Sequence, residues 1–64
     1  MNANAIQAGK TYESHTKGKR RKVLRIVLNG HNNVEYFDLR FPKLKQMVTL
    51  KAFAQWAGSE VPNA

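Results

Sequence analysis

Basic side chains gather in one short stretch of this 64-residue chain. Six of its eleven lysines and arginines fall between positions 17 and 25: Lys17, Lys19, Arg20, Arg21, Lys22 and Arg25. Such a cluster suits a phosphate backbone, because each neutralised phosphate releases counterions and adds affinity that does not depend on sequence. Arginine also offers bidentate geometry toward phosphate and base edges. The alternative is a solvated loop that keeps the protein soluble and protects a strand end from pairing.

A second, smaller group of candidate binding residues comes later in the chain. Lys43 and Lys45 alternate with an apolar residue, so both point the same way if the segment is extended. Tyr36 is the aromatic residue we favour as a possible stacking surface for a base. Tyr12 and Trp56 could also stack, but each is more readily explained as a core or core-rim residue.

The sequence offers no catalytic signature, and we expect no enzyme, no metal and no cofactor. It has no cysteine nucleophile, no Gly-x-Ser-x-Gly elbow and no phosphate-cradling glycine loop. Its two histidines, His15 and His31, are predicted to lie in loops at opposite ends of one strand. The spacing of the His, Asp and Glu residues gives no converging metal ligands.

Composition narrows the class of protein further. The formal net charge of +7 and the pI of about 10.3 favour a polyanionic partner, which could be nucleic acid, anionic lipid or an acidic protein surface. No cysteine, no signal peptide and no run of about 20 apolar residues is present, so we expect a cytoplasmic protein. We expect no peripheral membrane binding, because the short terminal helix carries one lysine and no long apolar stripe. A chain this short has a thin stability margin, and self-association is possible.

A β-hairpin is the element expected to position the basic cluster. Alternating patterns predict strands at about 21–29 and 34–41, joined by a bend over 30–33. A turn centred on His31-Asn32 would pair Ile26 with Phe37 and Leu24 with Leu39, and would place Arg25 opposite Asp38. The Asn29-Gly30 dipeptide is a strong hairpin signal, but its register would put Leu24 opposite Glu35. We therefore favour the first register, because burial of one face strongly specifies strand pairing.

This register predicts the core and the location of the binding site. The expected core comprises Leu24, Ile26, Leu28, Phe37, Leu39, Phe41, Leu50 and Phe53. The chain would leave the second strand at the end where the basic cluster lies, bringing Lys43 and Lys45 to that end. The bend would then be dispensable for binding.

The remaining segments complete a small β domain. We expect a flexible arm over 1–9, a domain over 10–58 and a flexible tail over 59–64. Within the domain, strands are predicted at 10–13 and 46–49, and Gly18 can take an unusual backbone conformation. Thr49 would cap a helix over 50–57 that ends at Gly58. The fold class is mostly β with one short C-terminal helix, as a small antiparallel bent sheet or an SH3-like barrel.

Two functions follow from these observations. The first is a non-enzymatic nucleic-acid-binding protein, with DNA and RNA both open, that grips phosphate through the cationic patch. The second is a regulator or inhibitor that docks on an acidic surface of a larger protein. The ending Val48-Thr49-Leu50, with Phe53 and Trp56 at helical spacing, resembles in style many small phage and mobile-element proteins, without a motif that identifies a family.

Overall fold

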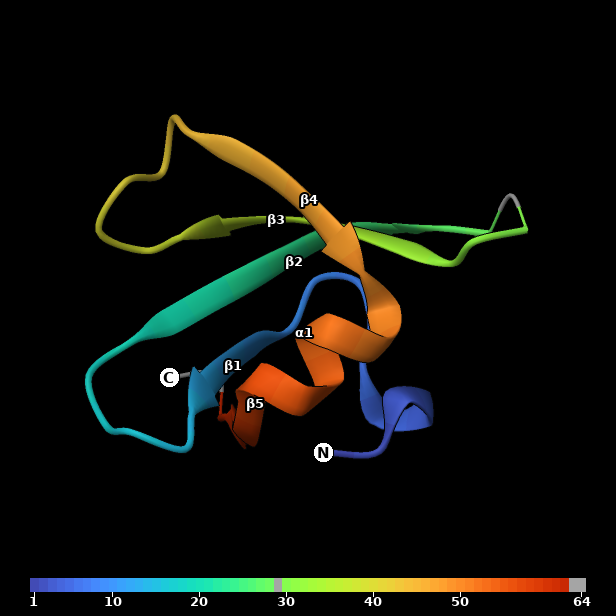
Figure 1. The fold of residues 1–64 in the computed structure, drawn as a ribbon. Helices are drawn as coiled ribbons and strands as arrows, with labels where there is room; N and C mark the ends of the chain where they lie inside the picture. Colours follow the sequence, from blue (N-terminus) through green and yellow to red (C-terminus); the bar gives the residue numbers. More distant parts are fainter. Residues whose placement is uncertain (29, 63–64) are drawn as a thin grey trace.

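Five antiparallel strands and one short helix make up the computed structural model, which describes residues 1–28 and 30–62 (Figure 1). The strands are β1 (Thr11–Ser14), β2 (Arg20–Val27), β3 (Asn33–Asp38), β4 (Lys45–Thr49) and β5 (Ala57–Val61). Helix α1 (Leu50–Trp56) lies between β4 and β5, and a single 3-10 turn, η1 (Ala3–Ala5), precedes β1. The sheet order is β4-β3-β2-β1-β5.

The architecture confirms the predicted fold class of a mostly β domain with one C-terminal helix. The sheet bends strongly, so that β1 and β5 turn away from the β2-β3-β4 layer and α1 sits against the concave side (Figure 1). Within residues 1–28 and 30–62, no ladder joins β4 to β5, so the sheet is open and not a closed barrel. No helix in the described ranges is long and apolar enough to cross a membrane.

The expected hairpin forms, but in a different register. Val23 pairs with Tyr36 and Arg21 pairs with Asp38, which is the register of the Asn29-Gly30 turn. Asn29 itself lies outside the described residues, as does the predicted end of the first strand. A β-bulge at Leu24 then shifts the pairing by one residue toward the bend. A bulge adds one residue to one strand, so no single unbroken register could have matched both halves.

The bulge also changes which face of the hairpin is buried. On β2 it brings Val23 and Ile26 to the same side, next to Val34 and Tyr36 of β3. The predicted core was therefore wrong for most of the hairpin: Leu28, Leu39 and Phe41 are exposed, and Leu24 and Phe37 are half-buried outside the core cluster. The buried hydrophobic residues are Ile6, Tyr12, Val23, Val34, Tyr36, Phe53, Ala54 and Ala57.

Helix α1 begins where the sequence indicated. The side chain of Thr49 accepts a hydrogen bond from the Ala52 N–H at 3.1 Å and caps the helix. The N–H of Leu50 also donates to the Asn32 carbonyl at 2.7 Å, which ties the hairpin bend to the first turn of the helix. The helix presents Phe53 to the sheet, where it packs edge-on to Tyr12 with ring centroids 5.7 Å apart. A seven-residue helix depends on such packing, because it is too short to persist in water.

Both segments that were expected to be flexible make contacts in the structure. In the N-terminal arm, Ile6 is buried. The Tyr12 hydroxyl binds this arm through two hydrogen bonds: it accepts one from the Gln7 N–H at 2.8 Å and donates one to the Ala5 carbonyl at 3.1 Å. At the other end, β5 pairs with β1 along residues 57–61. The predicted tail over 59–64 therefore begins inside a strand, and its last two residues lie outside the described range.

Candidate nucleic-acid interface

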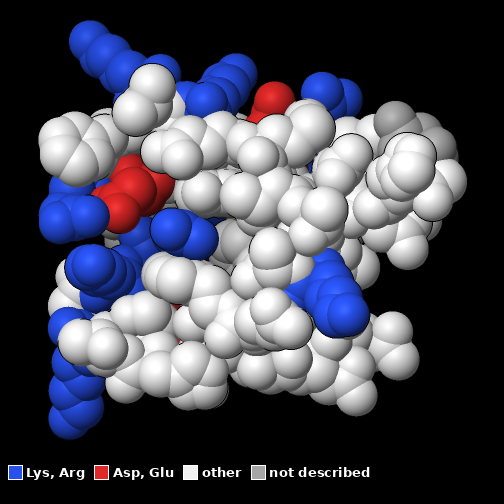
Figure 2. All heavy atoms as spheres, in the orientation of Figure 1, with Lys and Arg blue, Asp and Glu red and all other residues white. Residues whose placement is uncertain are grey.

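Two turns that carry basic residues lie at the same end of the sheet. The turn over 15–19 joins β1 to β2, and the turn over 39–44 joins β3 to β4. The Leu39 N–H donates to the Arg20 carbonyl at 3.0 Å, which fixes the start of the second turn beside the start of β2. Figures 1 and 2 show both turns on the left, where blue side chains gather along the edge of the molecule. This confirms the predicted placement of the two basic segments, remote from the hairpin bend.

Three of the four arginines at and beyond this end are paired with carboxylates. Arg20 bonds Glu13 at 3.2 Å, Arg25 bonds Glu35 at 3.1 Å, and Arg40 bonds Asp38 at 3.0 Å. The predicted pair of Arg25 with Asp38 is thus wrong, because the register that would have placed them opposite one another does not form. The arginine side chain of each pair is exposed, so solvent screens the pair and its contribution to stability is small, about 0–1 kcal/mol.

The ion pairs hold two of these carboxylates in their charged form. The Arg40 side chain, helped by the Arg40 backbone N–H, lowers the pKa of Asp38 below its usual range. The side chain of Arg20 likewise lowers the pKa of Glu13, with a smaller contribution from the Gly18 N–H. Gly18 reaches that position with a φ of +104°, a conformation that glycine adopts readily.

Lysine therefore carries the free positive charge of this end. The five lysines from the two turns and their neighbouring strands are Lys17, Lys19, Lys22, Lys43 and Lys45, and we call this group the basic end. All five are exposed, and within the described part of the chain none takes part in an ion pair. Lys22 and Lys45 both pair with Phe37, so they flank one residue of β3 from the two neighbouring strands.

Two members of the predicted site have structural roles instead. Tyr36 is 2% exposed, and its hydroxyl donates to Gln46 at 3.2 Å, so it cannot offer a face to a base. Arg21 lies half-buried between two rings, with its guanidinium carbon 4.7 Å from the Tyr36 centroid and 4.2 Å from the Trp56 centroid. The sequence analysis predicted both as binding residues because it placed the core on the other side of the hairpin.

An exposed apolar group that the sequence analysis missed lies beside the basic end. Leu39 is 43% exposed, and Phe41 and Leu44 are each 56% exposed. Phe41, Pro42, Lys43 and Leu44 surround a shallow hollow on the β3-β4 turn. Sequence pattern had assigned Leu39 and Phe41 to the core, but β3 ends at Asp38, so both residues fall in the turn. A side-chain hydrogen bond from Arg40 to Asp38 stabilises this turn in place of a longer ladder.

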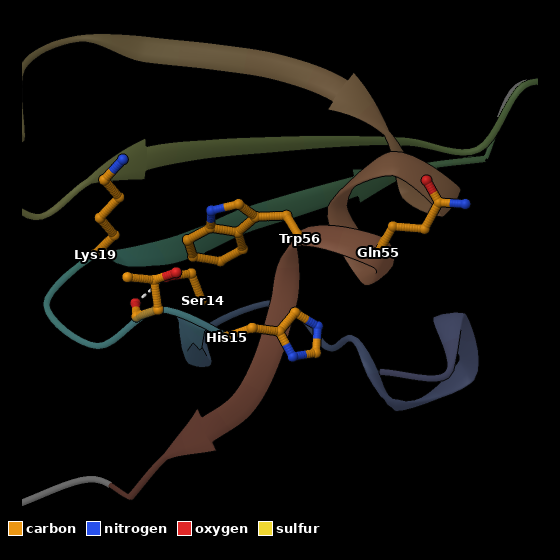
Figure 3. Close-up of a pocket in the computed structure, with 6 residues that line it drawn as sticks. Ser14, His15, Lys19, Gln55 and Trp56 are labelled. Carbon is orange, nitrogen blue, oxygen red and sulfur yellow. Dashed lines mark hydrogen bonds between the residues drawn. The ribbon is translucent and has the colours of Figure 1, made fainter.

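A second hollow opens on the helix side of the basic end. It has a volume of about 330 Å³ and is lined by Ser14, His15, Thr16, Lys19, Gln55 and Trp56. Figure 3 shows the Trp56 indole lying across it, with Ser14 next to the ring and Lys19 rising at one side. We call this hollow the Trp56 pocket. Lys19 belongs both to this pocket and to the basic end, so the two features are continuous.

The histidines lie where the sequence placed them, in separate turns. His15 is in the β1-β2 turn and lines the Trp56 pocket, whereas His31 is exposed in the turn between β2 and β3. In the parts of the chain that the structure describes, no group of three or more His, Asp or Glu side chains is placed to hold a metal ion.

Comparison with protein-family models, with curated proteins and with solved structures gives no match for this chain. The case for a function therefore depends on the charges, contacts and hollows of the molecule itself.

Proposed function

We propose that this protein binds nucleic acid without catalysis, and that the basic end grips the phosphate backbone. The main observation behind this proposal is that arginines and lysines have different surroundings in the structure. Arginines are paired with carboxylates or stacked on rings, while five lysines from two turns and the strands beside them remain exposed at one end. An ammonium group is a compact point charge that suits phosphate contacts without base recognition.

The sheet supports a continuous path for a phosphate backbone. Lys22 and Lys45 lie on strands that flank β3, so their backbones are about 10 Å apart, twice the usual spacing between neighbouring strands. Lys43 extends this path into the β3-β4 turn, and Lys17 and Lys19 extend it into the β1-β2 turn. Phe41, exposed next to these lysines, is the aromatic side chain available here for contact with a base, in place of the buried Tyr36.

Salt dependence gives the primary test of this proposal. If all five lysines neutralise phosphates, the logarithm of the association constant should fall against the logarithm of salt concentration with a slope of about −4.5 for duplex DNA or about −3.5 for a single strand. Fluorescence anisotropy with labelled DNA and RNA oligonucleotides over a salt series measures this slope directly. Absence of binding to any of these oligonucleotides at low salt would refute the proposal.

A matched pair of double variants locates the site. Lys22→Gln/Lys45→Gln removes two charges from the basic end and should reduce the salt slope by about 1.4–1.8. Lys10→Gln/Lys51→Gln removes the same charge from outside that end and should leave most of the affinity intact. Equal losses in the two variants would show that the attraction comes from net charge and not from the basic end.

A second candidate function is favoured by the apolar β3-β4 turn. Phe41 and Leu44 place exposed apolar surface directly beside Lys43 and Lys45, a combination that suits an acidic protein surface with an apolar centre. Under this alternative the protein acts as a regulator or inhibitor of a larger protein. Leu44→Ser would then abolish partner capture after nuclease treatment, whereas phosphate binding at the basic end predicts little effect of this variant on oligonucleotide affinity.

A further inference from the structure

We infer that the Trp56 pocket accepts an unpaired nucleobase, so that the protein prefers single-stranded to double-stranded nucleic acid. This inference rests on the proposed function, because Lys19 at the rim of the pocket belongs to the basic end that would hold the phosphates. A base within a duplex is stacked on its neighbours and cannot enter a lateral hollow. Only a strand with unpaired bases can use both features together.

The indole of Trp56 is held as a fixed platform. The guanidinium of Arg21 stacks at 4.2 Å from its ring centroid, and the Phe53 ring lies 5.3 Å away at an angle of 52°. Arg21 is itself placed by strand β2 and also contacts Tyr36 in the core. A half-buried aromatic ring whose neighbours fix its orientation loses little freedom when a base stacks on it.

The remaining walls supply polar groups that a base and its sugar can use. The Ser14 hydroxyl is already engaged, since it donates to the Thr16 carbonyl within the turn (Figure 3). In contrast, none of the hydrogen bonds found among the described residues uses the Thr16 hydroxyl, the His15 ring or the Lys19 ammonium. The pocket thus offers both donors and acceptors beside an aromatic surface, without a fixed pattern that would select one base.

The size and openness of the hollow agree with this ligand class. Its volume of about 330 Å³ falls at the small end of the range of about 300–1,000 Å³ that is common for small-molecule sites. Lys19, which lines the pocket, would attract a phosphate next to the inserted base. Base stacking on an aromatic side chain should strengthen single-strand binding by roughly 5- to 150-fold over phosphate contacts alone.

Trp56 reports directly on the proposed pocket, because it is the single tryptophan of the chain. Wild-type protein is titrated with oligothymidylate of about ten nucleotides and with a duplex of equal length at one salt concentration. The single strand should quench Trp56 fluorescence and bind more tightly than the duplex. If both oligonucleotides bind equally, and neither quenches the tryptophan, the pocket inference fails while the proposed function stands.

A variant that fills the Trp56 pocket provides a second test of the inference. Thr16→Phe places a large ring in the hollow at an exposed position, and should abolish the quench and lower single-strand affinity by roughly 5- to 150-fold without changing duplex affinity. His31→Phe adds the same ring at the exposed hairpin bend and should behave as wild type. Unchanged single-strand affinity and quenching in Thr16→Phe would overturn the inference. Failure of every oligonucleotide to bind would instead overturn the proposed function as well.

Discussion

At Gly58, β5 passes close to the end of β1, and replacement of this glycine by alanine tests the packing of that contact. A Cβ at position 58 would lie 3.0 Å from both the Cα and the N of His15, and 3.1 Å from the carbonyl carbon of Ser14. All three are backbone atoms. Their neighbours hold them, because the Ser14 N–H donates to the Lys19 carbonyl at 3.0 Å and Ser14 also pairs with Ala57. To accommodate the added methyl group, the backbone at the end of β1 must therefore move by a few tenths of an ångström.

Two opposing effects set the expected size of this change. Overpacking against atoms that cannot move freely costs typically about 1–3 kcal/mol. Replacement of glycine by alanine also restricts the unfolded chain, which stabilises the folded state by about 0.4–1 kcal/mol. The steric effect should prevail, so Gly58→Ala should lower the free energy of unfolding by about 1–2 kcal/mol. For a domain of this size, that corresponds to a fall in Tm of roughly 4–16 °C.

Thermal and urea unfolding followed by circular dichroism measure this difference. Ser59→Ala, at an exposed position on the same strand, is the matched control and should remain within about 0.5 kcal/mol of wild type. Gly58→Ala should also shift the emission of Trp56, because Ser14 and His15 line the pocket beside the indole. A variant as stable as wild type, with unchanged emission, would refute the reasoning that the β1-β5 contact is rigid.

Three further predictions concern the contacts that hold the sheet together. Tyr12→Phe removes the hydroxyl that bridges two backbone groups of the N-terminal arm and should cost about 1 kcal/mol. Burial raises the pKa of Tyr12, so the wild type should lose stability as the pH rises above about 10, and a pH series of urea midpoints should show a smaller loss in Tyr12→Phe. The pKa of Asp38 is lowered by Arg40, so this pair stabilises the fold above the ordinary pKa of the carboxyl and ceases to do so as the pH falls through the lowered value. Arg40→Gln should therefore show a shallower loss of stability between about pH 5 and pH 2, and an unchanged slope would contradict the assignment. Arg21→Lys retains the charge but lacks a planar group for stacking, so it should cost about 0.5–2 kcal/mol and alter Trp56 emission, and a silent substitution would show that the stacking contributes nothing.

The local elements of this fold could be predicted from the sequence because their signals are local. Alternation in the hairpin, the Thr49 cap and the apolar spacing of α1 indicated the right elements, although the second hairpin strand ends three residues earlier than predicted. The placement of the basic segments also followed, since any antiparallel hairpin brings the start of its first strand beside the end of its second. This part of the candidate site depends on topology and not on the details of pairing.

The buried face of the hairpin could not be predicted correctly, because polar residues on that face are stabilised by contacts that form only in the folded chain. Hydrophobic pairing favoured the face of Leu24, whereas the structure buries a face that includes Arg21 and Asp38. These polar groups are tolerated because Arg21 stacks on two rings and Asp38 is bonded by Arg40. The bulge at Leu24 could not be predicted from side-chain alternation, because that reasoning assumes one continuous register along the whole hairpin.

The fifth strand escaped prediction for a different reason. The segment Ala57–Val61 contains glycine, serine and glutamate and has none of the alternation expected of a strand. This segment forms a strand because the end of α1 places it beside the free edge of β1. There it extends the sheet through backbone pairing with β1. The Trp56 pocket was missed with it, since its walls come from the β1-β2 turn and from α1, segments that adjoin only when β5 is in place.

The separation between paired arginines and free lysines has a consequence for chemical modification. Acetylation neutralises amines but leaves guanidinium groups intact, so it would spare the ion pairs and the stacking of Arg21 on Trp56. The seven lysines of the chain carry as much charge as its whole formal net charge of +7. Acetylation of their side chains would therefore bring the protein near neutrality without removing any of these internal contacts. Under the proposed function, lysine would supply the attraction to polyanions while arginine makes the ion pairs and the ring stacking, so the first could be removed without the second.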